Sequence, residues 1–285
     1  MLVINRFGPP RKLDEMNKES APPGIDPTVP SAARIYDYLL GGKDNFAADR
    51  AAAEKLLQLA PNVKEGVREN RRFLKRAVRF MAERGIRQFL DIGAGLPTQE
   101  NTHQVALAAA PESRIVYVDN DPIVLVHGRA LLADNPQTIV VDGDLREPAT
   151  ILDNPEVTGH LDFSQPIGVL LLAILHFVPD QEQAERVCAA VRDRLAPGSA
   201  LAITHLTSGD LDKQKVDEGR AVYQGTEAGM PTPRTREQVL RFFDGFELVP
   251  PGVVATREWL EEEPLALPPL PGVDGFAGIG VLPGS

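Results

Sequence analysis

Residues 88–95 read Gln-Phe-Leu-Asp-Ile-Gly-Ala-Gly, and this short run carries most of the information about the architecture. The first five residues predict a buried strand of a parallel sheet, because such strands are short and apolar. The two glycines predict a turn in which the backbone can approach a ligand closely, since neither has a side chain. A strand, a glycine turn and a helix in this order are typical of α/β proteins that bind ligands at the carboxyl ends of their strands.

Strand-like and helix-like segments alternate beyond this turn. The segments are residues 114–119, 121–133, 138–142, 167–175, 180–195 and 200–205. This alternation predicts βαβ units, and therefore an α/β fold with a doubly wound, mostly parallel sheet. An apolar segment at residues 275–282 is expected to form the last strand.

Three further regions flank or interrupt this core. Residues 1–30 are rich in proline and are expected to form a flexible leader. Residues 31–85 contain helical patterns and are expected to form an N-terminal helical cap on the core, which spans residues 86–285. A polar stretch at residues 206–234 breaks the alternation and is interpreted as an insertion or lid.

The composition is that of a soluble globular protein, with 43% hydrophobic and 25% charged residues. A net charge of −10 disfavours general nucleic-acid binding, which needs a basic surface, although an arginine-rich helix near residue 70 leaves a local exception. The single cysteine, Cys188, and the lack of a long apolar run favour a cytoplasmic protein with no membrane span. No metal site is expected, because His103, His127 and His160 lack paired ligand spacing. The oligomeric state stays open.

Acidic residues follow the next two predicted strands. Asp119 is expected to accept hydrogen bonds from the two hydroxyls of a ribose, because it lies at the strand end where nucleoside-binding proteins carry such a carboxylate. The alternative is that Asp119 caps the next helix, a role for which Asp121 is better placed. Asp144 is expected to contact an adenine amino group, and the alternative for its Asp-Gly sequence is a simple turn. The loop neighbours Asn120, Gly143 and Leu145 belong to the same predicted site.

The glycine pattern argues against a dinucleotide. If Gly93 were the first glycine of a dinucleotide-binding motif, the third would fall at position 98, where the sequence has Thr98. The absence of that glycine weakens the expected pyrophosphate site. The sequence therefore favours a protein that binds a single nucleoside, and an NAD-dependent oxidoreductase remains the alternative.

These motifs together resemble those of class I S-adenosylmethionine-dependent methyltransferases. The resemblance rests on Asp-Ile-Gly-Ala-Gly at 91–95, Val-Asp at 118–119, Asp-Gly-Asp at 142–144 and Leu-His-Phe at 175–177. Two other stretches, Ala-Arg-Ile-Tyr-Asp-Tyr-Leu-Leu-Gly-Gly-Lys-Asp-Asn-Phe at 33–46 and Gly-Leu-Pro-Thr at 95–98, are similar to an actinobacterial family of S-adenosyl methyltransferases formerly listed as a domain of unknown function.

The resemblance implies a seven-stranded, Rossmann-like sheet whose last strand is antiparallel, with S-adenosylmethionine across the carboxyl ends of the first strands. It implies that Gly93, Ala94 and Gly95 approach the methionine portion of the cofactor. Asp119 would then bind the ribose and Asp144 the adenine. The Asp91 carboxylate would lie near the amino group of the cofactor, where the opposite charges attract.

The amino-terminal motif groups aromatic and polar residues around a double glycine, and we expect it to fold over the cofactor. Lys43 is a candidate for binding the methionine carboxylate, Tyr36 or Tyr38 for hydroxyl and ring contacts, and Asn45 for a further polar contact. The alternative is that the tyrosines pack this helix onto the body of the protein and that Gly41 and Gly42 only end it.

His176 is the leading candidate for a catalytic side chain. Its ordinary pKa suits a general base, and it is expected to face the cleft at the end of the fourth strand. A lone histidine can instead act as a hydrogen-bonding or stacking contact with the cofactor. His205 is a weaker candidate, and Tyr223 and Met230 are expected to line the acceptor pocket.

Three functions follow from these expectations. The first is a methyltransferase that acts on an unidentified small-molecule acceptor. For many acceptors, alignment of the two reactants is sufficient for methyl transfer. The second is a protein that binds S-adenosylmethionine as a sensor and transfers nothing, because no general base stands out. The third is the NAD-dependent oxidoreductase, which shares the glycine turn and the ribose carboxylate.

Overall fold

The computed structural model describes residues 25–97, 101–132, 135–209, 211–259 and 275–284. Most of the predicted leader, residues 1–24, lies outside the described residues. Position 98, where the dinucleotide motif would place its third glycine, lies outside them as well.

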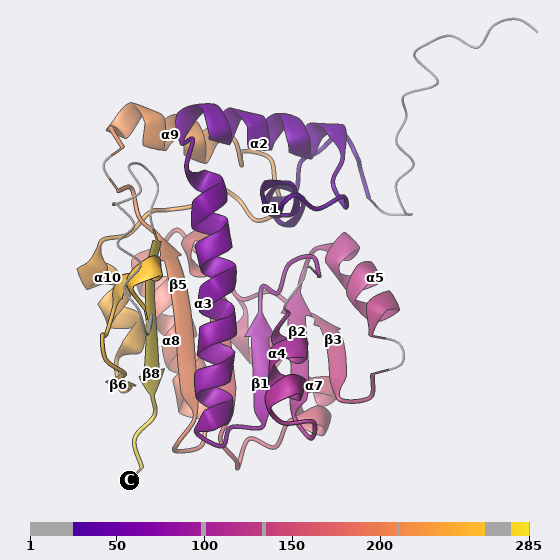
Figure 1. The fold of residues 1–285 in the computed structure, drawn as a ribbon, viewed down its shortest axis with the longest axis vertical. Coiled ribbons are helices and arrows are strands. Elements are labelled where there is room, and N and C mark those ends of the chain that lie inside the picture. Colours follow the sequence, from indigo (N-terminus) through magenta and orange to yellow (C-terminus); the bar gives the residue numbers. More distant parts are fainter. Residues whose placement is uncertain (1–24, 98–100, 133–134, 210, 260–274, 285) are drawn as a thin grey trace, which may run out of the picture.

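A mixed sheet forms the centre of the molecule (Figure 1). Its strands are β1 (Gln88–Ile92), β2 (Arg114–Asp119), β3 (Thr138–Asp142), β4 (Gly168–Leu172), β5 (Ala200–Leu206), β6 (Glu247–Leu248), β7 (Val254–Ala255) and β8 (Gly275–Val281). They are ordered β3-β2-β1-β4-β5-β8-β6, and β7 pairs with β8 beside this path. The first five strands pair in parallel, whereas β8 is antiparallel to β5. The predicted α/β sheet with an antiparallel last strand is confirmed, and the short β7 makes it eight-stranded.

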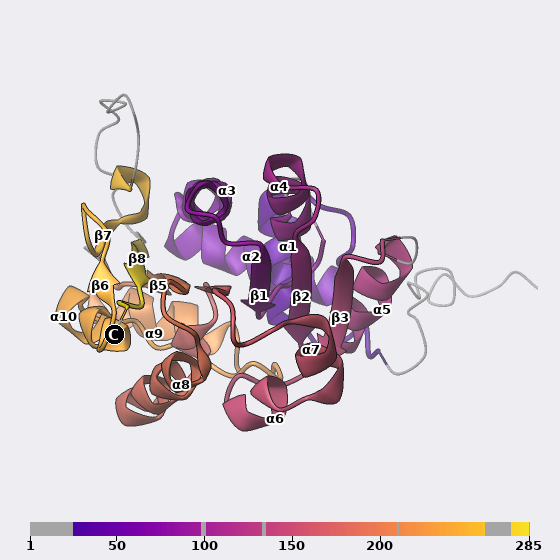
Figure 2. The same ribbon diagram turned by 90° about the horizontal axis from the view of Figure 1, so that it is seen from below.

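Helices cover both faces of this sheet (Figure 2). The α-helices are α1 (Ala32–Leu40), α2 (Ala47–Leu59), α3 (Val63–Glu83), α4 (Thr102–Ala109), α5 (Pro122–Leu131), α6 (Pro148–Leu152), α7 (Pro155–His160), α8 (Gln181–Arg194), α9 (Lys213–Ala221) and α10 (Arg236–Leu240), and the 3-10 helices are η2 (Leu175–Phe177), η3 (Arg241–Phe243) and η4 (Thr256–Glu258). Side chains of α3, α4 and α5 share one apolar core with the sheet, and those of α6, α7 and α8 share the other.

The long helix α3 shows why the sequence folds in this way. Phe73, Ala77 and Met81 recur at helical spacing, and each is fully buried. They pack in the core beside Phe89 of β1, which immediately follows the helix in the chain. The amino-terminal half of α3 projects beyond the sheet, where it meets α1 and α2 (Figure 1).

Two segments far apart in the sequence cover the carboxyl ends of the strands. Helices α1 and α2 come from the amino-terminal region, and α9 comes from the 206–234 insertion. Helix α9 packs beside α2 above the sheet (Figure 1). The chain returns from this insertion with the Arg234 backbone amide donating to the Leu206 carbonyl, at 3.1 Å, so the two ends of the insertion meet.

Strand β4 is shorter than predicted. It ends at Leu172, and the next residue, Ala173, has a φ of 55°, in the left-handed region that side chains disfavour. The Ala173 amide donates to the Thr204 hydroxyl, at 2.8 Å. The chain then forms η2, so His176 lies on a short helical turn rather than at the end of a strand.

Among the described residues, no helix combines the length and the apolar character needed to cross a membrane. Within those ranges, His, Cys, Asp and Glu side chains form no group of three or more that could hold a metal ion.

Candidate functional site

A cavity of about 600 Å³ lies at the carboxyl ends of β1, β2, β4 and β5. We call its lower boundary the floor, whose lining residues come from segments 91–96, 119–122, 172–177 and 204–206, and its upper boundary the roof, whose lining residues come from segments 25–60 and 207–233. Helix α3 closes one side between them. A cavity of this size suits a small molecule or a cofactor.

The glycine turn leaves its backbone open to this cavity. Gly93 and Gly95 have φ values of 76° and 68°, which residues with a side chain rarely adopt. A Cβ atom at Gly93 would lie 2.5 Å from the side chain of Ile174, whereas a Cβ atom at Gly95 would meet no atom within 4 Å. The Gly93 and Ala94 amides both donate to the carbonyl of Val118, so the turn is held against β2.

Asp119 lies beside this turn at the end of β2, 8% exposed. Its carboxylate accepts from the amides of Gly95, at 2.8 Å, and Asp121, at 3.0 Å. Burial raises the pKa of Asp119 to about 6, although these amides favour the charged form. Asp121 accepts from the amide of Ile123 and caps α5, so the capping role falls to Asp121 rather than to Asp119.

Asp91 lies at the opposite side of the turn, 5% exposed, and accepts from the Thr102 hydroxyl at 2.7 Å. Burial raises its pKa to about 6, against the effects of that hydroxyl and of the Arg71 guanidinium. Arg71 also lines the cavity and donates to the Asn101 side chain at 3.1 Å. A buried carboxylate and a guanidinium thus lie at the same end of the cavity.

Sequence reasoning did not single out Arg71. Helical spacing contained a signal, because Val67, Asn70, Arg71 and Leu74 lie on one face of α3 and all line the cavity. That signal has meaning only once the face is known to cover a cavity. The sequence instead suggests the arginine-rich part of this helix as a possible contact with nucleic acid.

Tyr36 is the predicted α1 residue that reaches the cavity. Its hydroxyl donates to the Val67 carbonyl at 3.2 Å and accepts from the Asn70 amide group at 2.8 Å. The Thr204 hydroxyl donates in turn to Asn70, at 2.6 Å. This chain of hydrogen bonds joins α1, α3 and β5 around the cavity. Tyr38 lies outside it, with its hydroxyl donating to Glu54 at the surface.

The expected position of Lys43 and Asn45 is corrected by the structure, since neither lines the cavity. The physical reason lies in Asp37, whose carboxylate accepts from the Asp44 amide, at 3.0 Å, and from the Asn45 side chain, at 2.9 Å. These bonds fold the turn after Gly42 back onto the end of α1.

The loop after β3 also differs from expectation. Gly143, Asp144 and Leu145 do not line the cavity, whereas Asn120 does. The Asp144 carboxylate accepts from the Arg146 side chain at 2.9 and 3.0 Å, and this contact lowers the pKa of Asp144. Leu145 is buried in the core beneath the sheet.

His176 and Phe177 line the cavity on the η2 turn, together with Tyr223 from the roof. The rings of His176 and Phe177 lie 4.5 Å apart, and those of Phe177 and Tyr223 lie 5.7 Å apart. Burial, with His205 and Arg234 nearby, lowers the pKa of His176 well below its usual value. Its Nδ1 atom is buried without a hydrogen-bond partner among the described residues.

His205 is fully engaged by its surroundings. Its Nδ1 atom lies 2.8 Å from the Leu206 carbonyl, to which it donates, and its Nε2 atom accepts from Arg234 at 2.9 Å. Burial, assisted by Arg234, lowers the pKa of His205 to about 4. Arg234 also donates to the carbonyls of Leu175 and Val178, at 3.1 and 2.7 Å, and thereby fixes the η2 turn.

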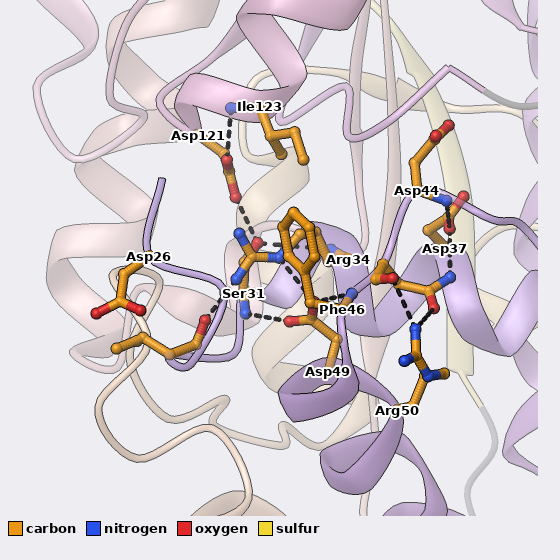
Figure 3. A network of polar contacts seen from close by, with 12 residues as sticks. Asp26, Ser31, Arg34, Asp37, Asp44, Phe46, Asp49, Arg50, Asp121 and Ile123 are labelled. Atoms are coloured by element: carbon orange, nitrogen blue, oxygen red, sulfur yellow. Dashed lines mark hydrogen bonds and ion pairs between the residues drawn. The ribbon is translucent and has the colours of Figure 1, made fainter. Parts of the chain in front are cut away.

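A buried ion pair holds the roof together and a serine joins it to the floor (Figure 3). Asp49 accepts from Arg34 Nε and from the amides of Ser31 and Phe46, at 2.8, 2.9 and 2.8 Å. The Arg34 and Asp49 side chains are 5% and 0% exposed. The Ser31 hydroxyl donates to the carboxylate of Asp121, the residue that caps α5 in the floor.

Comparison with known proteins is consistent with this geometry. A crystal structure of a candidate methyltransferase from Thermobifida fusca YX is 47% identical in sequence and superposes with a TM-score of 0.85, over 92% of this chain and 98% of that chain. A DUF574 family protein from Streptomyces avermitilis MA-4680 is 38% identical, with a TM-score of 0.81, over 90% of this chain and 98% of that chain. No curated protein matches the chain.

A family model gives the same result over almost the whole sequence. The model for S-adenosyl methyltransferases matches residues 18–283, which includes the cap, the sheet and the insertion. The resemblance seen in the amino-acid motifs is therefore confirmed. The chain belongs to the S-adenosyl methyltransferase family, and is an S-adenosylmethionine-dependent methyltransferase.

Proposed function

We propose that the chain methylates a small-molecule acceptor that binds beneath the roof, next to the cofactor. The observation that carries this proposal is the continuity of the cavity, which extends from the glycine turn and Asp119 to Leu56 and Leu59 of α2 and to Val216 of α9. One end supplies backbone and carboxylate groups for a nucleoside, and the other supplies side chains for a second small molecule.

The residues of the floor fit S-adenosylmethionine. The open space beside Gly95 leaves room for a ligand against the backbone, and the buried Asp119 carboxylate lies at the same turn. We assign the methionine portion to Gly93, Ala94 and Gly95 and the ribose to Asp119, with Asn120 beside it. When bound, S-adenosylmethionine supplies a methyl group attached to a positively charged sulfur. The methyl group is transferred to a lone pair of the acceptor, and the electrons of the broken bond stay on the sulfur.

The amino-acid end of the cofactor is assigned to Asp91 and Arg71. Asp91 has the charge to attract the cofactor amino group, and Arg71 has five N–H donors suited to a carboxylate. Arg71 therefore takes the role that the sequence had suggested for Lys43. Because Gly143, Asp144 and Leu145 lie off the cavity wall, the proposed contact between Asp144 and adenine requires a movement of the Arg146 side chain.

His176 is assigned to positioning rather than to proton abstraction. An imidazole whose pKa lies well below its usual value is a weak proton acceptor near neutral pH. The neutral ring can still hold an acceptor by a hydrogen bond and by stacking. In this proposal the acceptor proton leaves to water, and the residues of the cavity contribute alignment and exclusion of bulk solvent.

Two titrations test the cofactor assignment. S-adenosylhomocysteine carries the amino-acid group, whereas 5′-methylthioadenosine lacks it. Arg71→Ala is expected to weaken S-adenosylhomocysteine binding by about tenfold or more, because a charge-assisted hydrogen bond is lost, and to leave 5′-methylthioadenosine binding unchanged. Arg72→Ala is the matched control, because Arg72 pairs with Glu69 and does not line the cavity. Equal weakening of both ligands would refute the Arg71 role.

Turnover is tested with a labelled methyl donor and a panel of small metabolites. Incorporation of label into one compound supports the proposed function. If S-adenosylhomocysteine binds tightly and no compound in a broad panel is methylated, the protein acts as a sensor. If NAD rather than S-adenosylhomocysteine stabilises the protein against heat, the nucleoside assignment is wrong.

We further propose a cytoplasmic location. The supporting observation is Cys188, which is buried and free, so the described structure depends on no disulfide of this residue. A cysteine that is buried and free suits a reducing compartment. Fractionation of the cells that express the protein, followed by immunodetection, tests this location.

A further inference from the structure

Four aromatic side chains line the cavity, and we call them the aromatic wall. Tyr36 comes from α1, His176 and Phe177 from η2, and Tyr223 from the turn after α9. Phe177 meets Tyr223 at an interplanar angle of 63°, and His176 meets Phe177 at 54°. Aromatic side chains arranged in this way favour a further ring, which they contact by its face or edge.

Two polar side chains of this wall lack a hydrogen-bond partner among the described residues. The side chains of His176 and Tyr223 make no hydrogen bond with any described residue. Tyr36 differs, because its hydroxyl is already bonded to Val67 and Asn70. The Nδ1 atom of His176 is buried, and buried polar groups are nearly always satisfied, so this atom beside the cavity indicates that a ligand supplies the missing bond.

The charged residues around the same space are already engaged or stand at its rim. Arg34 is paired with Asp49, and Arg220 donates to the Pro231 carbonyl at 2.7 Å. Lys215 and Glu227 line the cavity from exposed positions. The four side chains of the aromatic wall are themselves neutral, because the pKa of His176 is lowered and those of Tyr36 and Tyr223 are raised. A charged ligand would lose its hydration there without gaining an opposite charge.

We call the part of the cavity next to the aromatic wall the chamber. Its apolar lining comes from helices of the roof and from α3. Leu39, Leu56 and Val67 all line the cavity and belong to one small hydrophobic cluster, which Tyr223 also joins. This cluster connects the amino-terminal helices with the insertion. A ligand bound here would therefore bury apolar surface against both parts of the roof.

We propose that this chamber binds an uncharged aromatic molecule carrying a hydroxyl group, with its ring against Phe177 and its hydroxyl between the His176 ring and the Tyr223 hydroxyl. The inference rests on the proposed function, since this molecule is the methyl acceptor class for the same site. It narrows the acceptor from any small molecule to neutral phenols and related hydroxylated rings.

Calorimetry with simple probes tests the inference on protein saturated with S-adenosylhomocysteine. 2-Naphthol has the ring and the hydroxyl, whereas naphthalene-2-sulfonate has the same ring and a negative charge. We expect 2-naphthol to bind at least tenfold more tightly. Equal affinity for the two probes, or no binding of 2-naphthol up to its solubility limit, would overturn the proposal.

Variants identify the polar contact. His176→Phe keeps a ring and removes both nitrogens, and Tyr223→Phe removes one hydroxyl. Each is expected to weaken 2-naphthol binding by about fivefold to tenfold, the loss of one hydrogen bond. Tyr38→Phe is the matched control, because the Tyr38 hydroxyl bonds Glu54 outside the cavity. If Tyr38→Phe weakens binding as much as the other two, the assignment fails.

Two readouts separate this inference from the cofactor assignment and from misfolding. S-adenosylhomocysteine affinity and the thermal unfolding midpoint are measured for every variant. Loss of S-adenosylhomocysteine binding by the wild-type protein would reject the proposed function itself. Retained S-adenosylhomocysteine binding together with absent 2-naphthol binding would reject only the aromatic acceptor. If His176→Phe does not fold, Tyr223→Phe decides the outcome.

Discussion

The floor and the roof of the cavity are built by different means. The floor takes its groups from turns that directly follow strands, so Gly93, Gly95 and Asp119 are placed by a few neighbouring residues and by the register of β1 with β2. The roof brings together the amino-terminal helices and the insertion, which are separated by more than 100 residues in the sequence. A local motif therefore specifies the floor, and long-range packing specifies the roof.

Asp49→Ala is expected to cause the largest loss of stability, because it removes the buried carboxylate that holds the roof together. The substitution leaves the buried Arg34 without its carboxylate and also removes the acceptor of two amides. The free energy of unfolding should fall by about 3–5 kcal/mol, as measured by urea denaturation. Glu54→Ala, at an exposed site on the same helix, serves as the control with an expected loss below about 1 kcal/mol. Similar losses for the two variants would contradict the structural role of the ion pair.

Gly93→Ala breaks the floor. A methyl group would meet Ile174 in a backbone conformation that disfavours side chains, so we expect a loss of about 2–3 kcal/mol in the free energy of unfolding. Gly95→Ala shares the positive φ but has open space, and should lose about 1 kcal/mol. Its methyl group would project toward the cofactor, so S-adenosylhomocysteine affinity should fall more than stability does. Denaturation and calorimetry on both variants provide the test, and identical stability losses would count against the close contact at Gly93.

The protonation of Asp119 gives a test of the floor that does not involve the roof. Burial raises the pKa of this acid from 3.8 to about 6, so between these values the folded protein holds more protons than the unfolded chain. The free energy of unfolding without ligand should therefore fall as the pH rises from about 4 to about 6. Asp119→Asn removes this component, and the difference between the two stability curves isolates it from Asp91. Parallel curves for wild type and variant would show that Asp119 does not titrate in this range.

Ser31→Ala is the mildest change, and it acts where roof and floor meet. The substitution removes the hydroxyl that donates to Asp121, and should lower the free energy of unfolding by about 1 kcal/mol. Because Ser31 and its neighbours Pro30 and Ala32 line the cavity, we expect S-adenosylhomocysteine to dissociate severalfold faster in stopped-flow measurements. Thr28→Ala, whose hydroxyl bonds Asp26 at the surface, should leave this rate unchanged. Identical rates for the two variants would disconnect the serine from ligand retention.

Sequence patterns were most informative where the determinants are local. The alternation of strands and helices gave the correct sheet, and Asp121 was correctly preferred as the cap of α5. They were less informative at β4, where the left-handed conformation of Ala173 ends the strand early. That conformation depends on a hydrogen bond from a distant strand, supplied by Thr204. No pattern within residues 167–175 contains this partner.

The candidate site divides in the same way. Ten of the positions suggested from the sequence line the cavity, namely Tyr36, Asp91, Gly93, Ala94, Gly95, Asp119, Asn120, His176, His205 and Tyr223. Lys43 and Asp144 do not, because Asp37 and Arg146 respectively impose other local arrangements that compete with a ligand. Arg71 went unrecognised, since its role depends on which face of α3 overhangs the sheet.

The meeting of Leu206 and Arg234 has a consequence for how such enzymes diversify. Both ends of the insertion are anchored at one point, by the bond between their backbones and by the contacts of Arg234 with the η2 turn. Residues 207–233 can accordingly be lengthened, shortened or exchanged without disturbing the register of the sheet. Exchange of this single segment between relatives would reshape the roof while the floor stays intact.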